Sequence, residues 1–220
     1  MSLTVVKCGG AALAQRPFQL HQHVAPGDGA LVVHGAGPRI AAALAAAGIA
    51  SEFAGGRRVT TPAALPLVRE AFRDENAALC RQIGPRAVGL MGDELGLCGE
   101  RIPELGEAGT LKPLVPAWLW ELLATDVVPV IAPLAKGPLN VNADDAAAVL
   151  AVALRADRLV FVSDVPGVLV DGSVVPELSE SDIGSLDSVL SGGIVPKLQA
   201  ALVAAREGVR VDVGATAVVA

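Results

Sequence analysis

Two lysines that stand beside glycine-rich segments are the first candidates for chemistry in this chain. Lys7 follows a short apolar run and precedes Cys8-Gly9-Gly10, whereas Lys197 follows the segment SGGIVP. A lysine that ends a buried strand lies at the carboxyl edge of a sheet, where glycine amides and a helix N-terminus can hold an anion. Lys197 falls in the predicted first turn of a helix, where a cation opposes the helix dipole, and such a broken local rule is typical of a functional site. The alternative for Lys7 is a solvated side chain before a glycine turn.

A second set of polar side chains frames the stretch from Leu139 to Leu169. Asn142 and Asp145 are spaced as a capping box for an alanine-rich helix, which is followed by an apolar strand and then by Ser163-Asp164-Val165-Pro166-Gly167. Ligands of open α/β sheets bind outside the carboxyl ends of the strands, so these loop ends are candidates for a binding site. The alternative is that the same residues only cap a helix and start a turn.

Two further loops carry small or basic residues. The segment HGAGP at residues 34–38 repeats the order of strand, small-residue loop and helix, which favours a phosphate or carboxylate cradle, although it matches neither the Walker pattern nor GxGxxG. We interpret His34 as a packed, hydrogen-bonded residue rather than a catalytic base. The loop from Glu52 to Thr61 carries Arg57 and Arg58, and a guanidinium there could grip a carboxylate with two parallel hydrogen bonds. A solvated hairpin tip is the alternative.

The elements that position these loops follow from the hydrophobic pattern. Apolar runs indicate buried strands at residues 3–6, 30–33, 87–91, 127–131, 159–162 and 209–213, and a final edge strand at 216–220. Helical spacing covers residues 66–83, 116–124 and the segment after Lys197, whereas residues 92–112 form a glycine-rich excursion without clear chemistry. We expect Trp118 and Trp120 to be core or dimer contacts. Strands that alternate with helices predict an α/β fold, with an open, mostly parallel central sheet sandwiched between helices.

Composition and charge argue against several classes of function. The net charge is −6 and no basic cluster is present, so we expect no nucleic-acid partner. Cys8, Cys80 and Cys98 are widely spaced and odd in number, which favours reduced thiols in a cytoplasmic protein over a disulfide framework or a zinc site. No leader segment opens the chain and no apolar stretch reaches spanning length, so we expect no membrane segment either.

Taken together, five stretches resemble the amino acid kinase family. They are VVKCGG, VVHGAGPRI, FAGGRRVT, NVNADDAAAVLAVALRADRLVFVSDVPGVL and GGIVPKLQAALVAAREGV, which occur in the family's order and cover the chain nearly end to end. Within the family, the resemblance is greatest to enzymes of arginine biosynthesis that transfer a phosphoryl group from ATP to the side-chain carboxylate of N-acetyl-L-glutamate. It therefore implies ATP, Mg²⁺ held mainly by the nucleotide phosphates, and a homodimer, and it names no protein ligand for the metal.

The same resemblance implies roles for individual residues. Lys7 and Lys197 would flank the transferred phosphoryl group, with Asp144 orienting both. The acceptor and phosphate cradle would comprise Ala36 and Gly37 opposite Gly9 and Gly10, with Arg58 on the α-carboxylate and Asn140 on the acetamido end. The nucleotide would lie along Asp164, Val165, Pro166, Gly167, Val168 and Leu169, together with Val189, Leu190 and Ser191. A single domain would span residues 1–220, with lobe 1–134 for the acceptor and the dimer and lobe 135–220 for the nucleotide.

These residue types suit the reaction that the resemblance implies. The nucleophile is a carboxylate with a reference pKa of roughly 4.3, so it is ionised at neutral pH and requires no general base. Phosphoryl transfer between two anions requires instead that their repulsion be cancelled, which lysines, glycine amides, helix ends and Mg²⁺ can do.

The chain also departs from the family pattern. Gly35-Ala36-Gly37 replaces a triple glycine, which is tolerated unless Ala36 requires a positive φ. The connection from Gly10 to Ala30 and the hairpin before Asn140 are shorter than usual, which affects regions that belong to the dimer side and the substrate lid. The chain starts directly at its first strand, without the extra N-terminal helix of arginine-inhibited relatives, so we expect a dimer that is insensitive to arginine.

Three alternatives compete with this interpretation. A kinase for carrier-protein-bound aminoadipate or glutamate, in lysine or arginine biosynthesis, should present a basic docking surface, which the net charge of −6 disfavours. A non-catalytic regulator that binds nucleotide or amino acid on the same fold is disfavoured by the presence of both lysines and Asp144. An NAD-dependent dehydrogenase is disfavoured because no full glycine fingerprint is followed by an acidic residue at the ribose distance.

Overall fold

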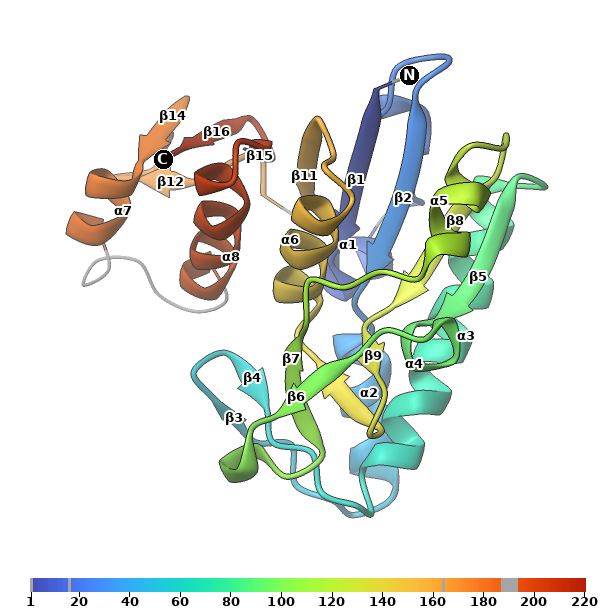
Figure 1. Cartoon of the computed structure of the whole chain (residues 1–220). Helices are drawn as coiled ribbons and strands as arrows, with labels where there is room; N and C mark the ends of the chain where they lie inside the picture. Colours follow the sequence, from blue (N-terminus) through green and yellow to red (C-terminus); the bar gives the residue numbers. More distant parts are fainter. Residues whose placement is uncertain (1, 16, 164, 187–193) are drawn as a thin grey trace.

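The computed structural model describes residues 2–15, 17–163, 165–186 and 194–220. Its central sheet has the strand order β14-β16-β15-β11-β1-β2-β8-β5 (Figure 1). The bounds are β1 Leu3–Cys8, β2 Gly29–His34, β5 Ala87–Met91, β8 Val128–Ala132, β11 Arg158–Val162, β14 Glu177–Ser179, β15 Arg210–Val213 and β16 Thr216–Val219. Within these described strands every neighbouring pair is parallel except β15 and β16. The predicted α/β fold with a mostly parallel sheet is confirmed.

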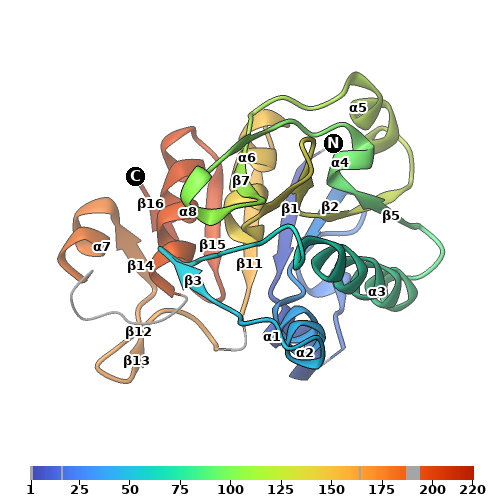
Figure 2. The same cartoon turned by 90° about the horizontal axis from the view of Figure 1, so that it is seen from below.

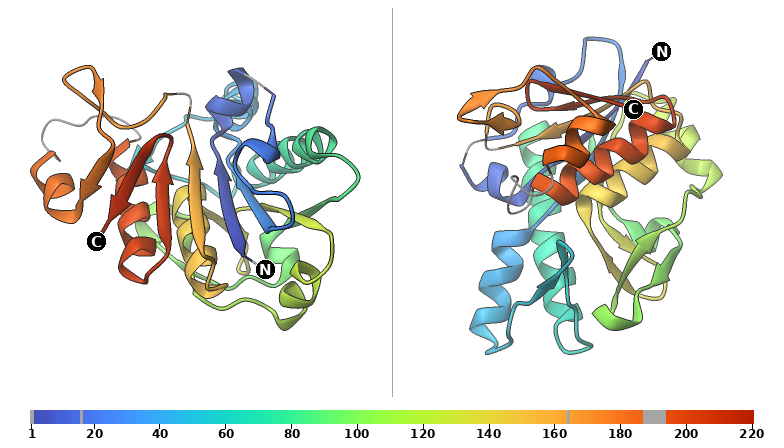
Figure 3. Two further views of the ribbon diagram at one scale, coloured as in Figure 1. Left: turned by 90° about the horizontal axis from the view of Figure 1, so that it is seen from above. Right: turned by 90° about the vertical axis from the view of Figure 1, so that its left-hand side faces the viewer.

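Helices cover both faces of this sheet (Figure 3). One face carries α5 (Ala117–Leu123), α6 (Ala143–Ala153) and α8 (Ile194–Arg206), and the other carries α1 (Gly10–Gln15) and α3 (Leu65–Ile83). The remaining helical elements are α2 (Gly37–Ala46), which packs beside α3, α4 (Gly92–Leu95), α7 (Glu180–Leu186) and the 3-10 turns η1 (Leu20–Gln22) and η2 (Pro103–Leu105). No helix in the described ranges combines the length and the apolar character that crossing a membrane requires.

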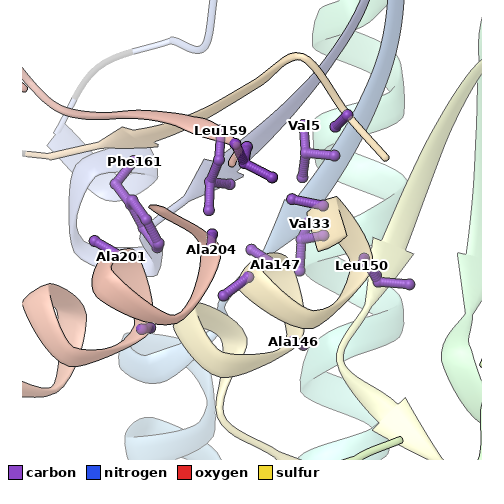
Figure 4. Packing of buried hydrophobic residues seen from close by; sticks show 14 of the residues in the cluster. Val5, Val33, Ala146, Ala147, Leu150, Leu159, Phe161, Ala201 and Ala204 are labelled. Atoms are coloured by element: carbon purple, nitrogen blue, oxygen red, sulfur yellow. The ribbon is translucent and has the colours of Figure 1, made fainter. Parts of the chain in front are cut away.

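Alternate residues of the central strands enter two separate cores, because successive side chains of a strand point to opposite faces. The core under α6 and α8 receives Val5, Leu31, Val33, Leu159 and Phe161, and the core under α1 and α3 receives Val6, Val32, Val160 and Val162. Figure 4 shows the first of these cores, in which Ala146 and Ala147 of α6 and Ala201 and Ala204 of α8 lie near the sheet. Only 3% of the residues are aromatic, so small side chains that let helices approach closely fill most of this space.

The edges of the sheet differ from the sequence prediction. β16 was expected at the edge, but β14 pairs with it on its outer side, and a strand of only three residues leaves little apolar pattern to detect. β5 was expected in the core and instead forms the opposite edge, with Val88 exposed. Trp118 and Trp120 are 41% and 44% exposed, so they are not core residues.

Smaller sheets lie beyond the carboxyl ends of the central strands. The excursion over residues 92–112, for which no chemistry was expected, contributes to a four-stranded sheet. This sheet pairs β6 (Gly99–Arg101), β7 (Ala108–Leu111), β10 (Leu139–Val141) and β9 (Leu134–Ala135), in that order. Two hairpins complete the fold, namely β3–β4 (Phe53–Ala54 and Arg57–Arg58) and β12–β13 (Leu169–Val170 and Ser173–Val174). The four-stranded sheet and the β3–β4 hairpin supply walls of the site described next.

Candidate active site

Lys7 and Lys197 meet on one carboxylate oxygen. The Nζ atom of Lys7 lies 2.7 Å from Oδ1 of Asp144, and the Nζ atom of Lys197 lies 2.9 Å from the same oxygen. β1 carries Lys7 to the carboxyl end of the sheet, whereas Asp144 and Lys197 belong to the first turns of α6 and α8. The three side chains are only 7%, 13% and 12% exposed. Two cations and one anion thus form a largely buried cluster with an excess of positive charge.

The structure also resolves the conflict between Lys197 and the dipole of its own helix. Asp144 supplies the negative charge that the start of α8 lacks, and it lies at the start of α6, where a carboxylate interacts favourably with the helix dipole. The ring of Phe161 lies 5.3 Å below the Lys197 Nζ atom, which adds a cation–π contact. The position of Lys197 is therefore compensated within the fold.

Burial and charge act on this cluster in opposite directions. Burial raises the pKa of Asp144, but the positive charges of Lys7 and Lys197 outweigh burial and hold this pKa below its ordinary value. The pKa of Lys197 is lowered, first by burial and then by the charge of Lys7, against the opposing charge of Asp144. Asp144 is accordingly ionised at neutral pH, and a negatively charged ligand would relieve the remaining repulsion between the lysines.

The N-terminus of α6 is held by Asn142. Its Oδ1 atom accepts hydrogen bonds from the backbone N–H groups of Asp144 at 2.8 Å and Asp145 at 3.2 Å, as expected for a cap. The predicted capping box is nevertheless wrong in its second half. The carboxylate of Asp145 accepts hydrogen bonds from Arg57, with Oδ2 lying 2.9 Å from Nε and 2.7 Å from Nη2, instead of returning to the backbone of Asn142.

Two glycine loops approach each other backbone to backbone beside the lysines. A Cβ atom on Gly10 would lie 2.9 Å from the backbone nitrogen of Gly37 and 2.9 Å from Cδ of Pro38, so only glycine fits there. Ala36 has a φ of −132°, a value that any L-residue adopts, and the alanine in the loop is therefore unstrained. A Cβ on Gly9 would lie 3.8 Å from the Lys7 Nζ atom, which places Gly9 next to the lysine cluster.

A cavity of about 220 Å³ joins these elements. Its walls include the predicted residues Lys7, Gly10, Ala36, Gly37, Arg58, Asn140 and Asp144. Phe53, Gly56 and Arg57 of the β3–β4 hairpin close one side, and Ala108 and Gly109 of β7 close another. Within the described ranges, no group of three or more His, Cys, Asp or Glu side chains is placed to hold a metal ion.

Arg58 is buried in this cavity wall although it belongs to a short hairpin. Its guanidinium lies 4.5 Å from the centre of the Phe53 ring and donates a hydrogen bond to Oγ of Ser51, and burial lowers the pKa of Arg58. No carboxylate among the described residues forms an ion pair with Arg58. The structure therefore excludes a solvated hairpin tip for this residue, and a buried guanidinium without an anionic partner favours an anionic ligand.

Asn140 is oriented by a short hydrogen-bond chain. Its Nδ2 atom donates to Oγ1 of Thr60 at 3.0 Å, and the Thr60 hydroxyl donates to the backbone oxygen of Arg58 at 3.2 Å. Both Asn140 and Thr60 are buried. One of the two amide N–H groups of Asn140 is thereby engaged, which holds this side chain in the cavity wall.

Among the described residues predicted for the nucleotide, those from Val165 to Leu169 lie outside the walls of this cavity. The loop from Val165 to Leu169 follows β11 and is attached to the β15–β16 turn, where the Val168 N–H donates to Oγ1 of Thr216 and the Pro166 oxygen accepts from the Ala215 N–H. Val168 packs in the core, so only its backbone is available to a ligand. Asp164, Val189, Leu190 and Ser191 lie outside the described residues.

His34 is confirmed as a packed residue. It is fully buried, Nδ2 of Asn76 lies 3.0 Å from its Nε2 atom, and burial lowers the pKa of His34 to about 4. Sequence reasoning missed the pair between Arg57 and Asp145. No local pattern indicated it, because an ion pair between residues that are 88 positions apart in the sequence depends on tertiary packing.

Comparisons with known proteins bear on the family and on the fold. The model of the amino acid kinase family matches residues 2–214. An acetylglutamate kinase of Chloroflexus aurantiacus is 40% identical and covers 91% of this chain and 82% of that protein, and one of Ruegeria pomeroyi is 38% identical and covers 95% and 79%. The crystal structure of smu.665 from Streptococcus mutans matches 99% of this chain and 98% of that chain with a TM-score of 0.88 and 26% identity. Giardia carbamate kinase, at 13% identity and a TM-score of 0.72, shares the fold.

Proposed function

The chain belongs to the amino acid kinase family, and from this premise we propose that it transfers the γ-phosphoryl group of ATP to the side-chain carboxylate of N-acetyl-L-glutamate. The observation that carries the proposal is the meeting of Lys7 and Lys197 on Asp144, beside a cavity whose wall also holds the buried Arg58. Arg58 has no carboxylate partner among the described residues. Both features fit a reaction in which a negatively charged donor and a negatively charged acceptor must touch. The similarity to proteins named acetylglutamate kinase supports the same acceptor.

The charges of the cavity favour an N-acylated acceptor over a free amino acid. Arg58 offers a guanidinium for the α-carboxylate, and Oδ1 of Asn140 can accept the N–H of an acetamido group. Among the described residues, Asp144 and Asp145 are near the cavity and both are already paired, Asp144 with the lysines and Asp145 with Arg57. The ammonium group of free glutamate would therefore enter a positive site in which the described residues offer no free anionic partner, which is costly in a desolvated pocket.

The proposed reaction requires no general base. An oxygen of the acceptor's side-chain carboxylate attacks the γ-phosphorus of ATP, an acyl phosphate bond forms, and the bond to the bridging oxygen breaks with its electron pair leaving on ADP. Lys7 and Lys197 would bind the phosphoryl oxygens and cancel the growing charge, and Asp144 would hold both ammonium groups in place. Mg²⁺ bound to the nucleotide phosphates would neutralise further charge, as is usual for this ion.

The remaining assignments extend this proposal. The nucleotide would lie along Val165 to Leu169 at the carboxyl end of β11, with lobe 1–134 binding the acceptor and lobe 135–220 binding ATP. A homodimer is part of the same proposal.

An ATP-dependent hydroxamate assay tests the function directly, because hydroxylamine traps an acyl phosphate as a hydroxamate, which forms a coloured complex with Fe³⁺. We expect a product with N-acetyl-L-glutamate and a far slower reaction with glutamate or aspartate. A hydroxamate formed only with carrier-bound aminoadipate would assign the protein to the other kinase class. If no acceptor reacted while nucleotide still bound, the protein would be a regulator rather than an enzyme.

A further inference from the structure

The β3–β4 hairpin carries two adjacent arginines with different partners. Arg58 lies under Phe53 in the wall of the cavity, whereas Arg57 reaches across to Asp145 in the first turn of α6. Asp145 is largely buried, and burial raises its pKa against the opposing charge of Arg57. A largely buried carboxylate needs a cationic partner to remain ionised, and the hairpin supplies it.

Two further contacts hold the tip of this hairpin. The Nδ2 atom of Asn142, the cap of α6, donates to the backbone oxygen of Gly56 at 3.2 Å. Gly56 has a φ of +75°, and a Cβ atom there would overlap the ring of Pro196, which immediately precedes Lys197 in α8. Figures 1 and 2 both show the hairpin beside α8. The hairpin is therefore attached to the starts of the two helices that carry Asp144 and Lys197.

We infer that Arg57 is a positioning residue that holds the β3–β4 hairpin against α6 through its ion pair with Asp145, a contact that we call the latch. The latch places Arg58 for the acceptor. It does so beside Asp144 and Lys197, which are placed for the phosphoryl group. The inference rests on the proposed function for its kinetic consequence. The latch itself is a property of the unliganded chain. The two adjacent carboxylates in the first turn of α6 then have different roles, since Asp144 forms ion pairs with both lysines and Asp145 forms an ion pair with the hairpin.

Arg57→Met tests the latch because it keeps an apolar stem and removes the guanidinium. We expect the Michaelis constant for N-acetyl-L-glutamate to rise about tenfold, since a charge-assisted hydrogen bond at a half-exposed site is lost, while that for ATP changes less than about twofold. Arg57→Lys keeps a positive charge, so its Michaelis constant for N-acetyl-L-glutamate should lie between those of the wild type and Arg57→Met. Arg206→Met is a matched control, because Arg206 also pairs with a carboxylate, that of Glu180, through Nε and Nη2 and lies in the last turn of α8.

The coupling between the two partners gives a second criterion. Asp145→Asn should resemble Arg57→Met, and the double variant should be no worse than either single variant, because both remove one interaction. Effects that multiply in the double variant, or an Arg57→Met variant that behaves as Arg206→Met does, would overturn the inference.

A measurement without substrate separates this inference from the proposed function. Phe53 is 60% exposed on the hairpin, and chymotrypsin should cut after it faster when the hairpin is released from α6, because cleavage requires a locally unfolded segment. We expect cleavage at Phe53 to be about tenfold faster in Arg57→Met than in the wild type or in Arg206→Met. Equal cleavage rates would refute the latch even if the enzyme phosphorylates N-acetyl-L-glutamate. Faster cleavage would support it even if the acceptor proves to be another molecule.

Discussion

Asp144 and Asp145 are neighbours in the first turn of α6, yet the pKa of Asp144 is lowered and that of Asp145 is raised. Burial raises both pKa values, but two lysines lower that of Asp144, whereas only Arg57 lowers that of Asp145 and the charge of Asp144 raises it further. The first carboxylate therefore remains ionised and binds the lysines firmly. The pKa of Asp145 therefore depends more strongly on its one cationic partner, Arg57.

Removing Lys197 should impair turnover more than binding. In Lys197→Ala, Asp144 keeps Lys7 as a partner, so no buried charge is left alone and the fold should persist. The phosphoryl group loses one of its two cations, and we expect turnover to fall by about 10²-fold or more, while ATP affinity stays measurable. The hydroxamate rate and a nucleotide titration measure the two quantities. Lys112→Ala, which removes an exposed lysine that makes no ion pair with Asp144, is the control. Unchanged turnover in Lys197→Ala would remove Lys197 from the mechanism.

Arg58→Ala should affect the amino acid rather than ATP. The guanidinium is buried without a carboxylate partner among the described residues, so its loss should raise the Michaelis constant for N-acetyl-L-glutamate about 10²-fold and leave that for ATP nearly unchanged. Arg58→Lys should recover only part of the loss, because an ammonium group cannot form two parallel hydrogen bonds to a carboxylate. The opposite pattern, a higher constant for ATP alone, would show that the two binding sites have been exchanged.

The sequence was sufficient for the fold class and for the loops that meet in the cavity. Short apolar runs followed by Lys7-Cys8-Gly9-Gly10 or by the segment at residues 34–38 fixed the carboxyl edge of the sheet, because parallel buried strands leave a strong local pattern. Strands of two or three residues, such as β3, β4, β10 and β14, leave almost no hydrophobic pattern in the sequence. The sequence analysis therefore missed the four-stranded sheet and the edge strand β14. The partners of Arg57 and Arg58 were equally hidden, since ion pairs between distant segments depend on packing that no local pattern encodes.

His34 should make stability depend on pH below neutrality. Burial lowers the pKa of His34 from 6.5 to about 4, so the unfolded chain binds the proton first as pH falls. The stabilising contribution is thus complete above pH 6.5 and is lost as pH falls toward 4, a change of about 3 kcal/mol. Urea unfolding at pH 7.5 and pH 4 should show that the stability difference between the wild type and His34→Gln narrows by this amount. A constant difference would mean that His34 does not titrate on unfolding.

Gly56→Ala should displace the β3–β4 hairpin from its contact with α8, and Gly55→Ala is the control. Gly55 and Gly56 both have positive φ, at +55° and +75°, so alanine at either position carries a similar backbone strain of about 1 kcal/mol. A Cβ on Gly55 meets nothing within 4 Å, whereas one on Gly56 overlaps the ring of Pro196. Only Gly56→Ala should therefore move the hairpin away from α8, raise the Michaelis constant for the acceptor about tenfold and expose Phe53 to chymotrypsin. If Gly55→Ala had the same effects, backbone strain rather than the contact with Pro196 would explain them.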